Sequence, residues 1–119
     1  MSIFKKNTKN DIEEIEPKEA FTILEKNKND PNYVPLDVRT PKEYDEGHIE
    51  NATYLNIKSK DFEAELDKLD NNKKYFVYCK SGKRSSKGIN LMKKHGFNEI
   101  YNITGGIDKW KSKRLPIEK

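Results

Sequence analysis

Apolar residues in this chain fall into short clusters that are separated by polar, turn-forming stretches. Four clusters have the length and the aromatic or β-branched content of strands, and they span residues 33–38, 52–56, 74–78 and 99–103. The cluster at 74–78 (KYFVY) is the best strand pattern, as expected for a central parallel strand with both faces buried. Pro35 removes one hydrogen-bond donor from the first strand.

Segments with a helical spacing of apolar residues lie between these strands. They predict helices over residues 17–26, 41–46, 59–69 and 85–95, with a further short helix after residues 105–106. Thr40 and Glu43 occupy the two positions of a capping box at the start of the second helix, and Gly96 is placed to end the fourth helix in a left-handed conformation. The alternation of strands and helices predicts an α/β fold in which helices cover both faces of a parallel sheet.

The length of the chain, 119 residues, corresponds to one domain. We expect residues 1–10 to form a polar lead-in and residues 11–119 to form the domain. Only 33% of the residues are hydrophobic and 37% are charged, but the apolar residues are clustered. This clustering favours a thin core under a polar surface over a disordered chain.

Charge is distributed unevenly along the chain, whose formal net charge is +4. No acidic residue lies between Asp70 and Glu99, and that stretch contains eight lysines and arginines. A local positive field of this kind attracts anions, either nucleic acid or a small molecule. Nucleic acid is the weaker interpretation, because the aromatic residues of this stretch, at 75, 76 and 78, belong to a strand that is predicted to be buried.

The chain has one cysteine, Cys79, which excludes an internal disulfide and a zinc site made of cysteine pairs. His48 and His95 are its only histidines, so we expect no metal and no cofactor. The sequence lacks an apolar run of the roughly 20 residues that span a bilayer, and its first residues lack the apolar stretch of a signal peptide. We therefore expect a soluble, cytoplasmic protein whose thiol is free to react.

Cys79 follows the central strand directly, and the next helix is predicted to begin six residues later. Ligands of parallel sheets bind beyond the carboxyl ends of the strands. Gly82 and the small Ser81 allow the backbone to curl so that its N–H groups form an anion nest, and the start of the helix adds positive potential. These surroundings favour the thiolate and would also stabilise a persulfide anion, so the sequence predicts a nucleophilic cysteine rather than an inert buried one. The residues expected to bind the substrate are Lys80, Ser81, Gly82, Lys83, Arg84 and Ser85.

This loop resembles the active-site loop of the rhodanese-like family, whose pattern is Cys-x-x-Gly-x-Arg-Ser/Thr. Residues 36–41 (LDVRTP), followed by Glu43-Tyr44, Gly47-His48-Ile49 and Asn51-Ala52, resemble the first signature of that family. Gly96-Phe97 and Gly105-Gly106-Ile107, with Trp110 and Pro116, resemble its C-terminal signature. The resemblance extends from about residue 12 to residue 117.

The resemblance implies a five-stranded parallel sheet and a sulfurtransferase activity. In that activity Cys79 takes a sulfane sulfur from an anionic donor such as thiosulfate, and the resulting persulfide passes it to cyanide, to a thiol or to an acceptor protein. Many members have arginine where this chain has Lys80, and lysine keeps the charge but loses the two-pronged hydrogen bonding of a guanidinium. The preferred donor is therefore open.

Two other functions compete with sulfur transfer. Cysteine-dependent phosphatases and arsenate reductases use a similar loop, with five residues between cysteine and arginine and usually a histidine before the cysteine. Here four residues separate Cys79 from Arg84, and Tyr78 precedes the cysteine, so the loop should be too narrow for tetrahedral phosphate. The other competitor is a binding module without activity, although inert relatives usually lose the cysteine.

Four residues outside the loop are expected to support the site structurally: Asp37, Arg39, Glu43 and His48. An ion pair between Arg39 and Glu43 would brace the end of the strand against the short helix. We interpret His48 as a hydrogen-bonded loop residue rather than a base. Two roles are open to Arg84, which either contacts the donor anion or binds carbonyls or a carboxylate and holds the loop in shape.

Overall fold

The computed structural model describes residues 5–7 and 12–119. Within these residues the strands form one six-stranded sheet in the order β1-β2-β6-β5-β3-β4. The strands are β1 (Lys5–Asn7), β2 (Ile12–Ile15), β3 (Tyr33–Asp37), β4 (Thr53–Tyr54), β5 (Lys74–Tyr78) and β6 (Glu99–Ile103). Strands β2 to β6 are parallel, which confirms the predicted five-stranded parallel sheet, and β1 runs antiparallel to β2 at one edge.

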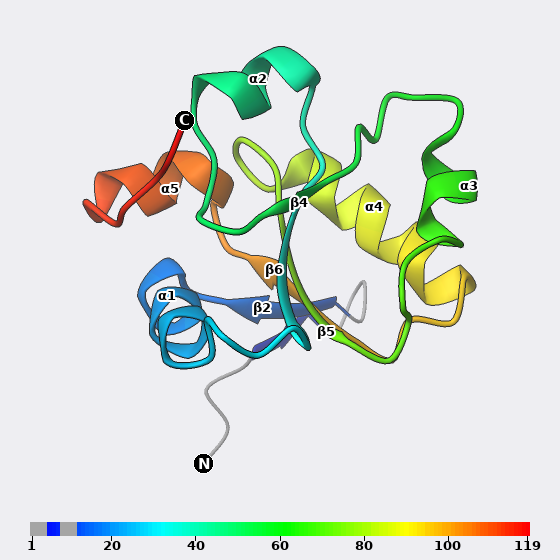
Figure 1. The fold of residues 1–119 in the computed structure, drawn as a ribbon, viewed down its shortest axis with the longest axis horizontal. Helices are drawn as coiled ribbons and strands as arrows, with labels where there is room; N and C mark the ends of the chain where they lie inside the picture. Colours follow the sequence, from blue (N-terminus) through cyan, green and yellow to red (C-terminus); the bar gives the residue numbers. More distant parts are fainter. Residues whose placement is uncertain (1–4, 8–11) are drawn as a thin grey trace.

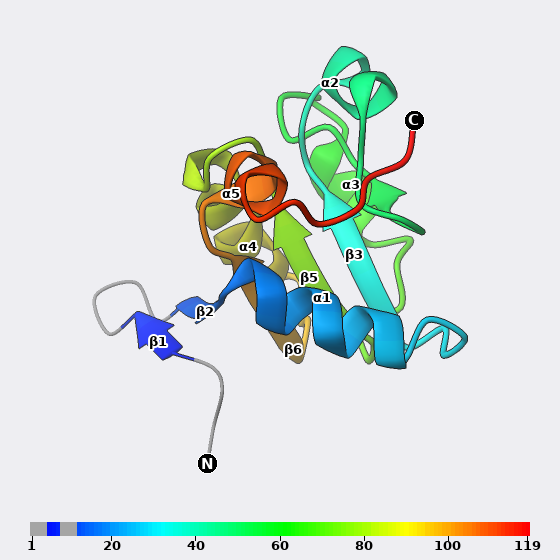
Figure 2. The same cartoon turned by 90° about the vertical axis from the view of Figure 1, so that its left-hand side faces the viewer.

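Helices cover both faces of the sheet, as predicted (Figures 1 and 2). They are α1 (Pro17–Lys26), α2 (Pro41–Glu46), α3 (Phe62–Leu66), α4 (Lys83–Lys94) and α5 (Gly106–Ser112). In Figure 1, α1 and α5 lie on the left of the sheet, and α3 and α4 lie on the right. The short helix α2 stands at the top of the view, above the carboxyl end of β3, and the loop between β5 and α4 ends beneath it.

Two apolar clusters fill the space between the sheet and its helices. Phe62 of α3 and Met92 of α4 pack with Val77 on one face, and Trp110 of α5 packs with Phe76 on the other. Neighbouring residues of β5 thus point to opposite clusters, so this strand is buried on both sides. Cys79, at the end of β5, belongs to the first cluster.

Helices α1 and α2 and strands β5 and β6 have the predicted bounds. Strand β3 ends one residue earlier than predicted, β4 has two residues rather than five, and two helices also differ from the prediction. Helix α4 begins at Lys83, two residues earlier than predicted, because Gly82 turns the chain into the helix. Helix α3 is only five residues long, and Asp61 rather than Ser59 is its N-cap residue. The Ser59 hydroxyl accepts a hydrogen bond from the Asp61 amide and so stabilises the turn before the helix.

The beginning of the described chain contains two strands that the sequence pattern did not predict. Most of the predicted lead-in at 1–10 lies outside the described residues, but Lys5–Asn7 pairs with β2 as an antiparallel strand. Strand β2 pairs in turn with β6, where Glu14 is in register with Asn102. A four-residue strand that contains two glutamates has no alternation strong enough to reveal this pairing.

Candidate active site

The loop after β5 curls around the sulfur of Cys79. The cysteine residue as a whole is 1% exposed. Gly82 has a left-handed conformation, with φ of 112°, and its N–H donates to Cys79 Sγ over 3.0 Å. The next three amides belong to the first turn of α4 and have no acceptor inside the helix. The sulfur therefore lies at the positive end of a twelve-residue helix.

The first turn of α5 is hydrogen-bonded to the backbone of this loop. The amides of Ile107 and Asp108 donate to the carbonyls of Cys79 and Lys80, over 2.9 and 3.0 Å. Because C=O and N–H point in opposite directions across a trans peptide, the next two amides of the loop point away from α5. The sequence showed a Gly-Gly turn here but did not reveal that the turn would support the cysteine loop.

Arg84 is paired with a carboxylate, which is one of the two roles that the sequence left open. Its guanidinium donates to both carboxylate oxygens of Glu43, over 2.8 and 2.9 Å. The predicted pair between Arg39 and Glu43 is therefore wrong. Glu43 also completes the predicted capping box with Thr40, so it ties the start of α2 to the start of α4.

We expect the Glu43–Arg84 pair to make stability dependent on pH at acidic values. The hydrogen bonds from Arg84 hold the pKa of Glu43 well below its ordinary value of 4.5. A carboxyl whose pKa is lowered by folding stabilises the protein fully above its unfolded pKa, and the contribution is lost as pH falls toward the folded pKa. Glu43→Gln should lower the free energy of unfolding by about 1 kcal/mol at pH 7, since solvent screens this part-exposed pair.

Urea denaturation at several pH values would measure this difference. The gap between wild type and Glu43→Gln should narrow as pH falls below about 4.5. Glu46→Gln, an exposed change in the same helix, is the matched control and should show a smaller gap. A gap that stays constant down to pH 3 would contradict the pairing.

The other predicted supporting residues form a buried network at the carboxyl end of β3. Asp37 is fully buried and accepts from the Arg39 guanidinium, with a shortest contact of 2.6 Å. Arg39 also donates to the carbonyl of Gly47, which joins α2 to this network. The Tyr78 hydroxyl donates to Asp37 over 2.8 Å, and burial together with this carboxylate raises the pKa of Tyr78 above its ordinary range. The residue before Cys79 is thereby held in position.

His48 lies in the loop that follows α2. Its ring stacks on Tyr44 with 3.9 Å between the ring centroids, and Nδ1 lies 2.9 Å from the Tyr44 carbonyl oxygen. Its backbone pairs with Glu118 near the end of the chain. These contacts agree with the interpretation of His48 as a hydrogen-bonded loop residue.

Comparison with known proteins agrees with this geometry. The profile of the family described as "Rhodanese-like domain" matches residues 20–113, which is most of the chain and includes the cysteine loop. The chain belongs to the rhodanese-like family. A rhodanese-related protein from Thermoplasma volcanium has the same fold, with a TM-score of 0.73 and 30% identity over 88% of this chain and 96% of that chain.

Two relatives of this rhodanese-like domain are longer than the matched region. "Uncharacterized protein YqhL" of Bacillus subtilis is 35% identical over 78 residues, which are 66% of this chain and 60% of the relative. The "tRNA uridine(34) hydroxylase" of Citrobacter koseri is 39% identical over 85 residues, which are 66% of this chain and 24% of the relative. The chain thus spans less than two thirds of either relative.

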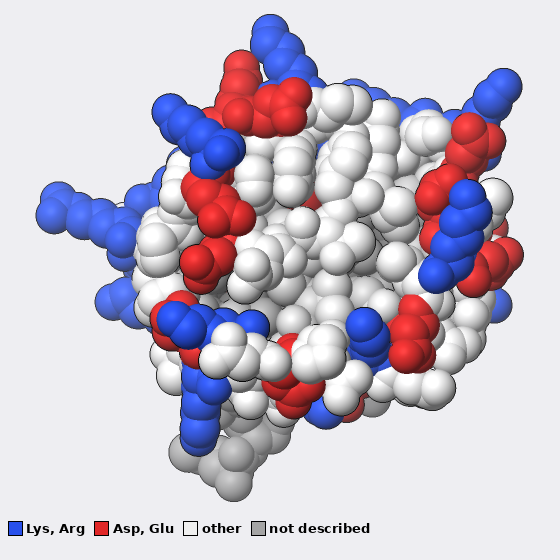
Figure 3. Space-filling view, viewed as in Figure 1, with Lys and Arg blue, Asp and Glu red and all other residues white. Residues whose placement is uncertain are grey.

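The basic stretch of the rhodanese-like domain does not form one continuous patch. Lys73 and Lys74 lie at the start of β5, whereas Lys80 and Lys83 lie beyond its other end, and residues 93–94 end α4. Figure 3 shows basic and acidic side chains mixed around the rim of one face, whose centre is uncharged. These three groups of basic residues are therefore separated from one another by the length of a strand or a helix.

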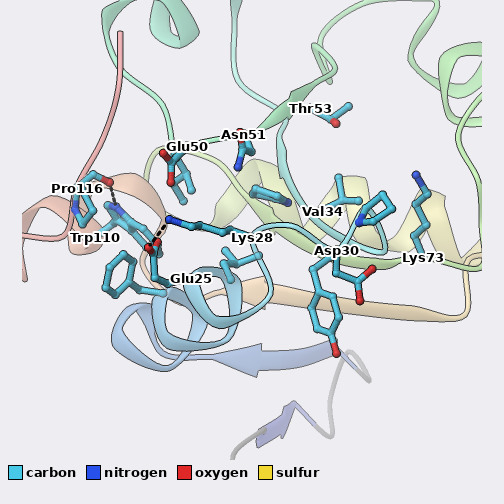
Figure 4. Close-up of a pocket in the computed structure, with 16 residues that line it drawn as sticks. Glu25, Lys28, Asp30, Val34, Glu50, Asn51, Thr53, Lys73, Trp110 and Pro116 are labelled. Atoms are coloured by element: carbon cyan, nitrogen blue, oxygen red, sulfur yellow. Dashed lines mark hydrogen bonds and ion pairs between the residues drawn. The ribbon is translucent and has the colours of Figure 1, made fainter.

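A cavity of about 300 Å³ lies between α1, β3 and α5 of the rhodanese-like domain (Figure 4). Its apolar wall includes Phe21, Val34 and Trp110, and charged residues surround it. The Trp110 indole N–H donates to the Pro116 carbonyl over 2.9 Å, so this tryptophan has the packing role that the sequence predicted. None of the lining residues belongs to the loop at 79–85, so the cavity is separate from the cysteine.

Within residues 5–7 and 12–119, none of the helices is long and apolar enough to cross a membrane.

Proposed function

We propose that this rhodanese-like domain is a sulfurtransferase that carries a sulfane sulfur as a persulfide on Cys79. The observation that carries the proposal is the hydrogen bond from the Gly82 amide to Cys79 Sγ at the start of α4. Backbone amides and a helix N-terminus favour a negative charge on sulfur. Membership of the rhodanese-like family supports the same activity.

The reaction would proceed in two displacements. The thiolate of Cys79 attacks the outer sulfur of a donor such as thiosulfate, the sulfur–sulfur bond of the donor breaks, and sulfite leaves with the bonding electron pair. The terminal sulfur of the persulfide then carries the negative charge among the amides of the loop and of the first turn of α4. A nucleophilic acceptor attacks this terminal sulfur, and the thiolate of Cys79 leaves.

Charged side chains near the loop would guide the anionic donor. Lys83 is exposed at the first position of α4. Lys80 is also exposed, and it pairs with Asp108 over 2.9 Å. Arg84 is held by Glu43, so its proposed contribution is the shape of the loop and its positive field rather than a free guanidinium. Lys83 is therefore the side chain that we assign to donor attraction.

The proposed acceptors are cyanide, a small thiol or the thiol of a protein in the cytoplasm. The relative named tRNA uridine(34) hydroxylase is matched over 24% of its length, so we do not extend tRNA hydroxylation to this chain. The phosphatase alternative has less support, because the four residues between Cys79 and Arg84 form a loop one residue shorter than the phosphatase pattern.

Mass spectrometry of the intact protein would test the proposal. After exposure to thiosulfate, wild type should gain the mass of one sulfur atom, because the thiolate displaces sulfite and keeps the outer sulfur. Cyanide should remove this mass, and Cys79→Ser should not acquire it. Cys79 is the only cysteine, so the serine variant is a complete blank.

The phosphatase alternative has its own readout in the same preparation. Hydrolysis of a generic aryl phosphate that depends on Cys79, with no gain of sulfur from thiosulfate, would reject sulfur transfer in favour of phosphoryl transfer. Absence of both reactions in the folded protein would favour a binding module.

A further inference from the structure

A chain of polar groups runs from Cys79 through the sheet to β2. Ser85 Oγ lies 3.4 Å from Cys79 Sγ and 2.6 Å from Asn102 Oδ1. The amide nitrogen of Asn102 donates to both carboxylate oxygens of Glu14, over 3.2 and 3.0 Å. Thr104 Oγ1 donates to the same carboxylate over 2.9 Å. Ser85 and Asn102 are buried, and Glu14 lies outside the region that the family profile matches.

Glu14 determines which way the Asn102 amide faces. A carboxylate accepts hydrogen bonds and does not donate them, so the amide nitrogen must face Glu14 and Oδ1 must face Ser85. The Asn102 oxygen carries no hydrogen, and so the Ser85 hydroxyl must be the donor between them. The hydroxyl has one proton, and Asn102 Oδ1 at 2.6 Å is a closer acceptor than the Gly82 carbonyl at 3.1 Å.

The consequence for Cys79 is that a lone pair of Ser85 Oγ faces its sulfur. A lone pair accepts a hydrogen bond from the thiol and repels the thiolate. Ser85 can donate to the thiolate only if its hydroxyl rotates and breaks the hydrogen bond to Asn102 Oδ1. Among the described residues, that buried oxygen would then have no donor. This arrangement therefore opposes the thiolate, whereas the Gly82 amide and the start of α4 favour it.

We propose that Glu14 and Asn102 are positioning residues that orient the Ser85 hydroxyl and thereby set the pH at which Cys79 ionises. The significance for sulfur transfer rests on the proposed function. In a persulfide the negative charge lies on the terminal sulfur, one bond further from Ser85, so the lone pair disfavours charge on Sγ more than charge on the terminal atom. The arrangement would favour the sulfur-loaded enzyme over the free thiolate.

Charged groups on the elements around the loop also act on Cys79, and the test leaves them unchanged. They are Lys80 in the loop, Lys83 and Arg84 on α4, Glu43 on α2, Asp37 on β3 and Asp108 on α5.

Titration of the Cys79 thiolate by its ultraviolet absorbance, with Cys79→Ser as the blank, would test this proposal without a sulfur donor. In Glu14→Gln the side-chain amide can face either way, so Asn102 is free to turn its nitrogen toward Ser85, and the hydroxyl can then donate to the thiolate. The pH of half-ionisation should fall by about one unit. Glu13→Gln is the matched control, because it removes the same charge from the adjacent residue of β2, whose side chain points to the other face of the sheet. Its titration should remain close to that of wild type.

Two measurements separate this effect from the simple loss of a negative charge. In 1 M salt the Debye length is about 3 Å, so a shift caused by charge through solvent should disappear, whereas the shift caused by Ser85 should persist. In a Ser85→Ala background, Glu14→Gln should produce no further shift.

Three results would overturn the proposal: an unchanged titration in Glu14→Gln, a shift that disappears in high salt, or a full shift in the Ser85→Ala background. A folded wild type that takes up no sulfur from thiosulfate would contradict the proposed function and leave this titration result in place.

Discussion

Gly106→Ala should destabilise the protein by about 3 kcal/mol and slow sulfur uptake by Cys79 about 100-fold. A Cβ atom at this position would lie 2.5 Å from the carbonyl oxygens of both Cys79 and Lys80. Those oxygens belong to backbone that α5 holds by two hydrogen bonds, so neither can move without moving the cysteine loop. The left-handed φ of 60° adds about 1–2 kcal/mol for any residue with a Cβ, and overpacking adds about 1–3 kcal/mol. A displacement near 1 Å at a reacting atom accounts for a loss of about 100-fold.

Gly96→Ala is the matched control for this change. Gly96 also has a left-handed φ, of 84°, but its added Cβ would meet only the Asn71 side-chain nitrogen at 3.4 Å. It should therefore show the backbone strain of about 1–2 kcal/mol without loss of sulfur uptake. Thermal or urea denaturation and the rate of mass gain from thiosulfate measure the two effects separately. A normal rate in folded Gly106→Ala would show that α5 does not position the loop.

Asp37→Asn should lower the free energy of unfolding by about 3–5 kcal/mol, the largest loss of stability that we expect from one change of a polar side chain. The Asp37 carboxylate is fully buried, and Arg39 is 4% exposed beside it. An asparagine would leave the guanidinium charge of Arg39 buried without its counter-ion. The Tyr78 hydroxyl, which donates to the same carboxylate, would lose a charged acceptor as well.

Denaturant unfolding of three variants would measure this contribution. Asp45→Asn makes the same chemical change at an exposed position of α2 and should alter stability by less than about 0.5 kcal/mol. Asp37→Asn with Arg39→Met should be more stable than Asp37→Asn alone, because the double variant no longer buries an unpaired charge. If Asp37→Asn were as stable as wild type, the ion pair between Asp37 and Arg39 would contribute nothing to folding.

The sequence by itself determined the elements whose signals are local. The apolar run of β5, the capping box of Thr40 and Glu43, and the turn at Gly96 each depend on residues a few positions apart, and the structure has all three. The cysteine loop belongs to the same class, because a strand end, a glycine and a helix start follow one another directly. Local hydrogen bonding and the periodicity of apolar residues are sufficient to predict such features.

Only the tertiary structure decided which distant groups meet at the cysteine. Arg84 pairs with Glu43, which is 41 positions away and which was predicted from the sequence to pair with Arg39. Asn102 is hydrogen-bonded to Glu14, which is 88 positions away. The sequence order of charged residues does not reveal these partners, since each depends on the order of strands in the sheet and on which helix ends face one another. The orientation of the Ser85 hydroxyl, and with it the environment of the sulfur, follows from those long-range contacts.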